Sequence, residues 1–215
     1  EVAGVQMVED VLPWEQMKLR MLNGSHSFLA YLGYLAGYAH INECMQDDSF
    51  REAARRLMLN EQAPTLRITN VDLTAYADSL LDRFANPALQ HRTWQIAMDG
   101  SQKLPQRMLD GIRVHLERHT AWPLLALGVA GWMRYVSGTD EQGNAIDVRD
   151  PLSDKFQAIV TTSSDAERVS TLLTLNEIFG DDLPQNPVFV EAITSAYQRL
   201  VRLGARQAVI ETLKI

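Results

Sequence analysis

Patterns typical of helices run through nearly all of the 215-residue sequence, and they restrict the fold to the all-α class. From residue 14 to about residue 39 the chain is mostly apolar and helix-compatible, with interspersed glycines that indicate close packing against neighbouring helices. Residues 65–69 alternate in polarity, but this segment is short and isolated, so it is a weak strand signal. We therefore expect one all-α domain of about eight helices over residues 1–215.

Start and stop signals place the remaining helices. Ser49 and Glu52 form a capping box and predict a helix to about residue 60. Asn70 or Asp72 can begin the next helix, which Asn86 and the proline after it end. Further helices are expected at 105–118, at 121–137, from a Ser164–Glu167 capping box to Gly180, at 187–204 after an Asn186 N-cap, and at 205–213, with a loop at 138–150.

Charge and composition exclude several functional classes. The net charge of -7 argues against a nucleic-acid surface, which requires clustered positive charge. The longest apolar run, 124–136, contains Arg134 and is too short to cross a bilayer, so we expect no membrane partner. The lone thiol of Cys44 follows the acidic Glu43, which favours a buried spectator over a nucleophile. A cysteine-poor composition fits a reducing cytoplasm.

Motifs for nucleotides and metals are absent from the sequence. Dinucleotide binding in the common α/β mode requires a strand, a Gly-x-Gly-x-x-Gly turn and a helix, and the glycines at 128 and 131 lie inside a predicted helix. His115 and His119 have a spacing that can hold a metal, but no third ligand accompanies them. We expect no metal, and no complete dinucleotide site within this chain.

Three polar residues lie within the long apolar helix predicted near the start of the chain. Asn23 and His26 are three residues apart, and Lys18 and His26 are eight apart, so all three can lean toward one cavity. An ammonium held in an apolar pocket can exchange a proton near neutral pH. An amide can donate to a developing alkoxide, and an imidazole can orient a hydroxyl. Spacing alone favours a lysine that extends to solvent and an asparagine and histidine that only pack. The catalytic interpretation requires that Lys18 be held out of water beside Asn23 and His26.

A second polar segment, 94–105, precedes the helix expected at Pro105. Its turn of Asp, Gly and Ser presents Lys103 and backbone N–H groups where an anion or hydroxyls could bind. The competing interpretation is an ordinary helix N-terminus that Asp99 or Ser101 caps.

Both segments resemble signatures of the long-chain mannitol dehydrogenase family. Lys18, Asn23 and His26 match its lysine, asparagine and histidine, and the Asp-Gly-Ser-Gln-Lys-Leu-Pro run that starts at Asp99 is similar to its second motif. The resemblance implies the helical C-terminal domain of that family, of the 6-phosphogluconate dehydrogenase C-terminal-like type. It also implies a metal-independent reaction with NAD, bound mainly by an N-terminal Rossmann domain absent from this chain. Lys18 would be the general acid/base, Asn23 part of an oxyanion hole, His26 a substrate hydrogen-bond partner, and Lys103 a substrate contact.

One departure from the polyol members of the family concerns the substrate. Where they look to carry an arginine, this chain has Gln95, and the segment 91–100, which includes Asp99, is more similar to the fructuronate reductase (mannonate oxidoreductase) branch. That branch interconverts D-fructuronate and D-mannonate, and the substrate carboxylate needs a cationic partner, for which Arg92, Lys103 and His91 are candidates. The alternatives are a mannitol or arabinitol dehydrogenase and a non-catalytic helical binding module. The sequence begins in mid-pattern, so we expect a fragment that is inactive alone.

Overall fold

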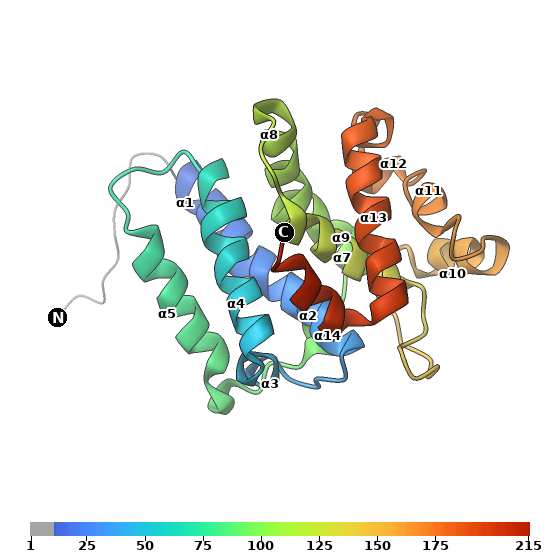
Figure 1. Ribbon diagram of the computed structural model, residues 1–215, viewed down its shortest axis with the longest axis horizontal. Helices are drawn as coiled ribbons and strands as arrows, with labels where there is room; N and C mark the ends of the chain where they lie inside the picture. Colours follow the sequence, from blue (N-terminus) through green and yellow to red (C-terminus); the bar gives the residue numbers. More distant parts are fainter. Residues whose placement is uncertain (1–10) are drawn as a thin grey trace.

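The computed structural model describes residues 11–215, and within that range the chain is helical and forms no strand (Figure 1). The all-α prediction is confirmed, although the described residues divide into more and shorter helices than the eight expected. No helix in this range is long and apolar enough to span a membrane. The α-helices are α1 (Leu12–Met17), α2 (Ser25–Leu35), α3 (Ile41–Gln46), α4 (Asp48–Arg56), α5 (Leu73–Ala85), α6 (Thr93–Ala97), α7 (Gly100–Leu104), α8 (Asp110–Arg118), α9 (Pro123–Val136), α10 (Ser153–Thr162), α11 (Arg168–Leu172), α12 (Asn176–Phe179), α13 (Pro187–Leu203) and α14 (Ala205–Thr212). Three π-helical segments, η1 (Lys18–Gly24), η2 (Leu57–Gln62) and η5 (Pro105–Leu109), and three 3₁₀ turns, η3 (Ala63–Thr65), η4 (Pro87–Leu89) and η6 (Leu183–Gln185), connect or extend them.

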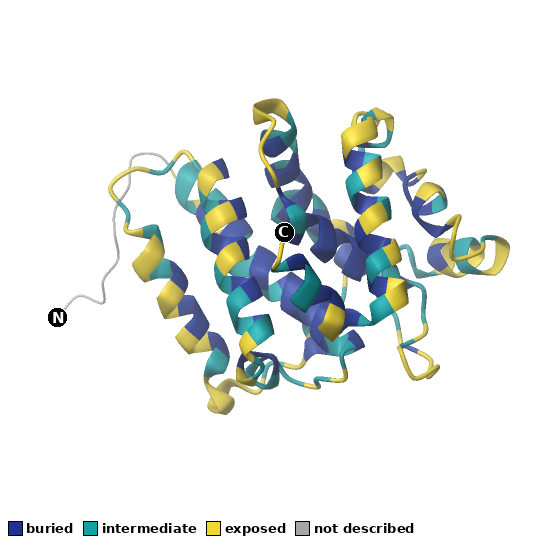
Figure 2. Cartoon of the chain, in the orientation of Figure 1, coloured by how far each residue is buried: buried dark blue, intermediate teal, exposed yellow. Residues whose placement is uncertain are grey.

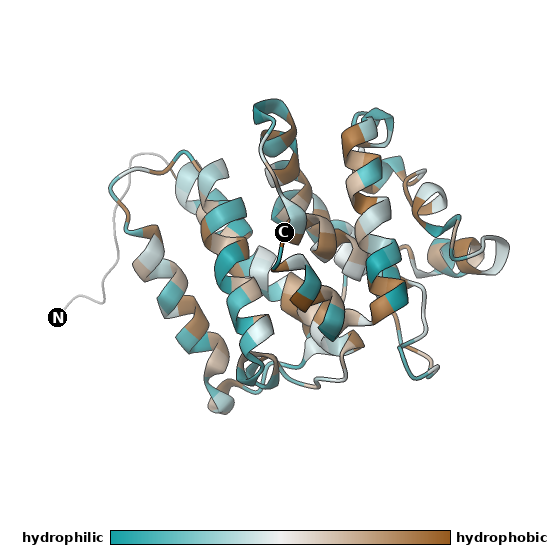
Figure 3. Ribbon diagram, viewed as in Figure 1, coloured by the Kyte–Doolittle hydropathy of each residue, from teal (hydrophilic) through white to brown (hydrophobic). Residues whose placement is uncertain are grey.

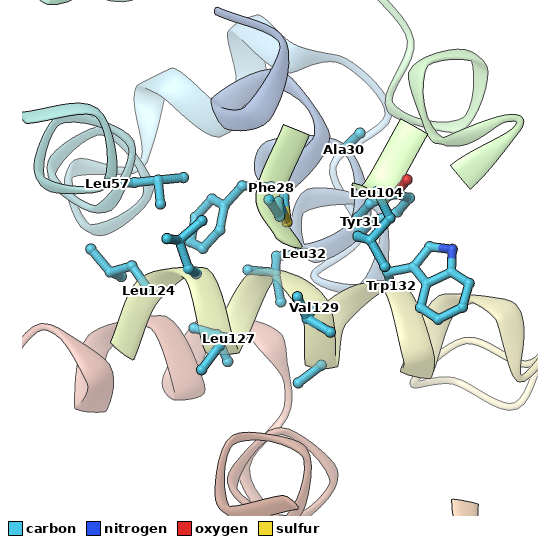
Figure 4. Close-up of a cluster of buried hydrophobic side chains, with 14 of the residues drawn as sticks. Phe28, Ala30, Tyr31, Leu32, Leu57, Leu104, Leu124, Leu127, Val129 and Trp132 are labelled. Atoms are coloured by element: carbon cyan, nitrogen blue, oxygen red, sulfur yellow. The ribbon is translucent and has the colours of Figure 1, made fainter. Parts of the chain in front are cut away.

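The core forms where α9 packs between α2 and α13. Nearly every residue of α9 is buried, which explains why its sequence is apolar around the whole helix (Figures 2 and 3). Phe28 and Leu32 of α2 meet Leu127 and Val129 of α9 in this core (Figure 4). Gly131 permits the close approach, because a Cβ there would lie 2.9 Å from the Leu32 side chain.

A buried carboxylate caps this central helix. Glu61, at the end of η2 and only 4% exposed, accepts hydrogen bonds from the backbone N–H groups of Leu124 (2.8 Å) and Leu125 (2.7 Å). These donors belong to the first turn of α9 and have no partner within the helix. A side chain more than sixty residues away in the sequence thus fixes the start of the core helix, which local sequence signals cannot reveal.

Several predicted helix boundaries are confirmed. The Asp72 carboxylate accepts from the backbone N–H of Ala75 (2.9 Å) at the start of α5, and the Asn186 side chain caps α13 as expected. The segment 138–150 is a loop with a turn around Asp140. Local side-chain-to-backbone capping explains this success, since each cap lies within three residues of its donor.

Other boundary predictions are wrong. Asp47, not Ser49, caps α4, and its carboxylate accepts from the Ser49 backbone N–H (2.9 Å). The helix expected from Pro105 begins at Gly100, and the proline, which cannot donate a backbone hydrogen bond, lies where α7 passes into η5. Glu167 does accept from Ser164, but the helix starts at Arg168 and divides into α11 and α12 before Gly180. The structure adds α3, α6 and α10, and the segment 65–69 is not a strand.

Candidate functional site

The long helix predicted at 14–39 ends at Leu35 and contains the π-helical segment η1, which carries two of the three candidate residues. A Cβ at Gly24, the last residue of η1, would lie 2.7 Å from the Arg107 carbonyl oxygen and 2.8 Å from Nε2 of Gln62. Glycine therefore lets η1 pack directly against η5, the helical segment that follows the second polar segment. π-helical turns are frequent at functional sites, where they redirect side chains.

Lys18 does not lie in an apolar pocket formed by the described residues. Its side chain is exposed, and its ammonium makes no hydrogen bond or ion pair within residues 11–215. The expectation that this domain holds the amine out of water is wrong for the chain taken by itself. Asn23, one turn further along η1, is partly buried.

His26 lies between two aromatic rings. Its imidazole stacks on Phe84 of α5 with 4.9 Å between ring centroids, and it meets His91 edge-on at 5.4 Å. Nε2 is buried and has no hydrogen-bond partner in the described chain. Burial, with smaller contributions from His91, Arg107, Arg83 and Lys103, lowers the pKa of His26 to about 3. The imidazole is therefore neutral at physiological pH and can serve as a hydrogen-bond partner, though not as a cation.

A sharp turn joins α6 to α7 at Asp99. This residue adopts the left-handed conformation (φ 55°), its backbone N–H donates to the Arg149 carbonyl (2.9 Å), and its own carbonyl accepts from the backbone N–H of Lys103 (3.2 Å). The Asp99 side chain is exposed and does not cap α7.

The cap of α7 comes instead from the loop after α9. The Asp150 carboxylate accepts from the backbone N–H (2.8 Å) and the hydroxyl (2.6 Å) of Ser101. The competing interpretation, in which the Asp99 or Ser101 side chain caps the helix that follows, is therefore wrong. Asp150 lies at the end of the predicted loop, next to Pro151, and the sequence around it does not reveal that its carboxylate binds Ser101.

Lys103 folds back over the turn that precedes it. Its ammonium donates to the carbonyl oxygens of Met98 (2.5 Å) and Ile96 (3.3 Å), and the side chain is partly buried. Burial, together with the charge of Arg107, lowers the pKa of Lys103.

Two of the predicted substrate contacts lie apart from His26. Arg92 and Gln95 are exposed, and the Arg92 guanidinium lies 5.6 Å from the centroid of the Trp94 ring. Arg149 lies over the same ring at 5.1 Å. No contact in the described part of the chain joins Arg92 or Gln95 to His26, whereas His91 touches it directly.

Sequence reasoning missed two cations near His26, Arg107 and Arg83. Nη1 of Arg107 donates to the Ser27 hydroxyl (2.9 Å), next to His26 along α2. Arg83 is the neighbour of Phe84 in the sequence, and its charge acts on His26. One signal was available: Arg107 follows Lys103 by four residues, which places both on the same side of a helix. The structure thus brings together His26, His91, Lys103, Arg83 and Arg107.

The remaining candidates have structural roles. Both ring nitrogens of His115 are engaged, Nδ1 with the Thr120 hydroxyl (2.7 Å) and Nε2 with the Glu61 carbonyl (2.6 Å), so this residue does not present a free ligand for a metal. Cys44 is fully buried, and burial raises its pKa to about 12. The thiol lies against Gly33, where an added Cβ would collide with its sulfur. Cys44 is therefore a buried spectator, as predicted.

Comparison with known proteins places this geometry in a family. Residues 10–201 match the model of the mannitol dehydrogenase C-terminal domain. The chain belongs to the mannitol dehydrogenase family. It is 73% identical over 215 residues, its whole length, to the Escherichia coli oxidoreductase YeiQ, and 61% identical over 207 residues, 96% of its length, to the D-mannonate oxidoreductase of the same organism.

A solved structure of the mannitol dehydrogenase family has the same architecture. Mannitol 2-dehydrogenase of Pseudomonas fluorescens, in a ternary complex with NAD and D-mannitol, superposes with a TM-score of 0.92 at 37% identity. That match covers 99% of this chain and 43% of the other. The chain likewise spans 44% of YeiQ and 43% of the D-mannonate oxidoreductase, so it is less than half as long as the relatives it matches.

Proposed function

We propose that this chain is the substrate-binding and proton-transfer domain of an NAD-dependent oxidoreductase that interconverts D-fructuronate and D-mannonate. The observation that carries the proposal is the group of cations, Arg83, Lys103 and Arg107, around the neutral His26. In a chain with a net charge of -7, such a group suits an anionic sugar better than a neutral polyol. Identity supports the same choice, since it is 61% to D-mannonate oxidoreductase and 37% to two yeast mannitol dehydrogenases.

The glycines of α9 do not form a phosphate-binding turn. The only clustered glycines of the α9 segment, Gly128 and Gly131, lie inside a buried helix and pack against side chains of α2 and η5, so they cannot cradle phosphates. We therefore place NAD in a part of the full-length enzyme outside this chain, in agreement with the greater length of the relatives. The bound cofactor would supply the redox chemistry: NADH would donate a hydride to the ketone carbon, and NAD⁺ would accept one from the alcohol carbon.

Lys18 is assigned as the proton-transfer residue. Its exposed ammonium extends from η1 toward solvent, so it is free to face a substrate that lies between this domain and the remainder of the enzyme. In ketone reduction it delivers a proton to the forming alkoxide, and in alcohol oxidation it removes one. Closure of the cleft by the missing part would supply the exclusion of water that this chain alone does not provide.

Asn23 and His26 are assigned to bind and orient the reacting oxygen and its neighbours. The amide of Asn23, on the same π-helical segment as Lys18, can donate to negative charge that develops on the oxygen. The unpartnered Nε2 of neutral His26 can bond a substrate hydroxyl once the substrate is bound. His91 and Lys103, which lie near His26, are assigned as further substrate contacts. Asp99, Arg92 and Gln95 are assigned to the outer part of a bound sugar.

A comparison of substrates in the full-length enzyme tests this proposal. We expect oxidation of D-mannonate with NAD at a kcat/KM at least about 100-fold above those of D-mannitol and D-arabinitol, since a buried charge-assisted contact is worth about 3 kcal/mol. Preference for either polyol would refute the assignment and favour a polyol dehydrogenase. Absence of turnover with all three sugars would favour a non-catalytic helical module.

A further inference from the structure

The cations that are candidates for the substrate carboxylate differ in position and in how far their charge is already offset. Arg92 lies over the Trp94 ring and is exposed, away from His26. The Lys103 ammonium donates to two carbonyl oxygens, and the negative charges of Asp99 and Asp150 act on it. Arg92 therefore lies outside the site, and the charge of Lys103 is partly offset.

Arg107 has no such balance. No carboxylate of the described chain forms an ion pair with it, and besides burial the one group that acts on its pKa is Tyr31. Burial lowers that pKa, yet a guanidinium stays charged in a protein interior. A partly buried cation without a counter-charge is costly, so it indicates a site prepared for an anion.

The position of Arg107 is fixed from three directions. Its carbonyl oxygen accepts from Nε2 of Gln62 (3.0 Å) and faces Gly24 of η1. Its Nη1 donates to the Ser27 hydroxyl, one residue beyond His26. The guanidinium is therefore held beside His26 before any ligand arrives, which lowers the cost of binding one.

The guanidinium retains free donors. Nε is buried without a hydrogen-bond partner, and Nη2 makes no hydrogen bond in residues 11–215 and is not buried. Nη2 is thus a donor that remains available to a ligand. A carboxylate is the group whose two oxygens suit the planar donors of arginine.

We propose that Arg107 binds the carboxylate of the sugar-acid substrate and so determines the preference of this site for sugar acids over polyols. This inference rests on the proposed function and adds the residue that reads the charge of the substrate. A polyol offers no anion to Arg107, so its binding leaves the guanidinium unbalanced. D-Mannonate neutralises it.

The test uses the full-length enzyme and compares Arg107→Gln and Arg107→Lys with the wild type. We expect Arg107→Gln to reduce kcat/KM for D-mannonate by about 100-fold or more, mainly through KM, and to change kcat/KM for D-mannitol by less than about threefold. Arg107→Lys keeps the charge but loses the planar donors, so about a tenfold loss with D-mannonate is expected. Arg118→Gln is the matched control, because Arg118 lies on the adjoining α8, is exposed and bonds only the Pro64 carbonyl.

Binding of D-mannonate to the cofactor-free enzyme, measured by calorimetry, separates this inference from the proposed function. If D-mannonate is not oxidised but Arg107→Gln still abolishes its binding, the proposed reaction is wrong and the carboxylate site stands. If D-mannonate is oxidised and the variant leaves its KM and its preference over D-mannitol unchanged, the inference about Arg107 is overturned. A variant in which kcat/KM falls equally for D-mannonate and D-mannitol also overturns it, because the loss then does not depend on the charge of the substrate. If Arg107→Gln does not fold, the folded Arg107→Lys enzyme provides the same comparison.

Discussion

Replacement of Gly24 by alanine should separate η1 from η5 and destabilise the chain. The added Cβ would lie 2.7 Å from the Arg107 carbonyl oxygen, whereas ordinary contacts begin at 3.4 Å, so roughly 0.7 Å must be gained between two helical backbones. Overpacking of this kind costs up to about 3 kcal/mol, and the better helix propensity of alanine offsets about 1 kcal/mol. We therefore expect the free energy of unfolding to fall by about 2 kcal/mol.

Urea unfolding of the 215-residue chain, followed by circular dichroism, measures this change. Gly111→Ala is the matched control, because that glycine is also helical and also faces Gln62, but its Cβ would meet a side-chain atom at 3.1 Å and nothing else closer than 3.9 Å. The control should leave stability unchanged or raise it by up to about 1 kcal/mol. If Gly24→Ala proves as stable as the wild type, the close approach of η1 to η5 does not hold the site together.

The remaining predictions concern pH. In the native state His26 has a pKa of about 3, whereas the imidazole of the unfolded chain has its ordinary pKa of 6.5. Below pH 6.5 the unfolded state therefore binds a proton that the native state does not. The contribution of His26 to stability should then be lost as pH falls, by up to about 1.4 kcal/mol per pH unit. His26→Gln should remove that slope, and equal slopes in variant and wild type between pH 4 and 6 would contradict the burial of this ring. Glu61 has the opposite sign: burial raises its pKa to about 7, so the native state holds its proton more tightly, and stability from this group falls as pH rises from 4.5 through 7. Unfolding of Glu61→Gln across that range should lack this fall, and an unchanged profile would show that the carboxyl is ionised in the native state.

Short-range signals in the sequence predicted much of the fold. Asp72 and Asn186 cap the helices that begin immediately after them, because the capping donor lies within three residues of the cap. The apolar run within 121–137 predicted a helix there, and the structure has α9 in that place. Caps supplied from a distance, such as Glu61 at α9 and Asp150 at α7, could not be predicted, because their partners meet only after the chain has folded.

The candidate site was predicted only in part, because some of its residues come together only after the chain has folded. His26 and Lys103 are in motifs of the family, and their neighbourhood follows from the packing of η1 on η5, which needs the absent side chain of Gly24. Arg107 was missed because an arginine on a helix is usually a solvated surface residue, and only its hydrogen bond to Ser27 and its lack of a carboxylate partner distinguish it. The exposure of Lys18 contradicts the expectation that this chain holds the amine out of water beside Asn23 and His26.

The rate of hydride transfer in a Lys18→Ala full-length enzyme tests most directly whether this domain carries the proton-transfer group. Stopped-flow measurement of NADH formation from D-mannonate should show kcat reduced by at least about 100-fold, with KM changed only a few-fold. Lys155→Ala, at an exposed lysine of α10 that pairs with Glu177, should behave as the wild type. An unchanged kcat in Lys18→Ala, with only KM raised, would show that Lys18 helps to bind the sugar and that the proton moves elsewhere.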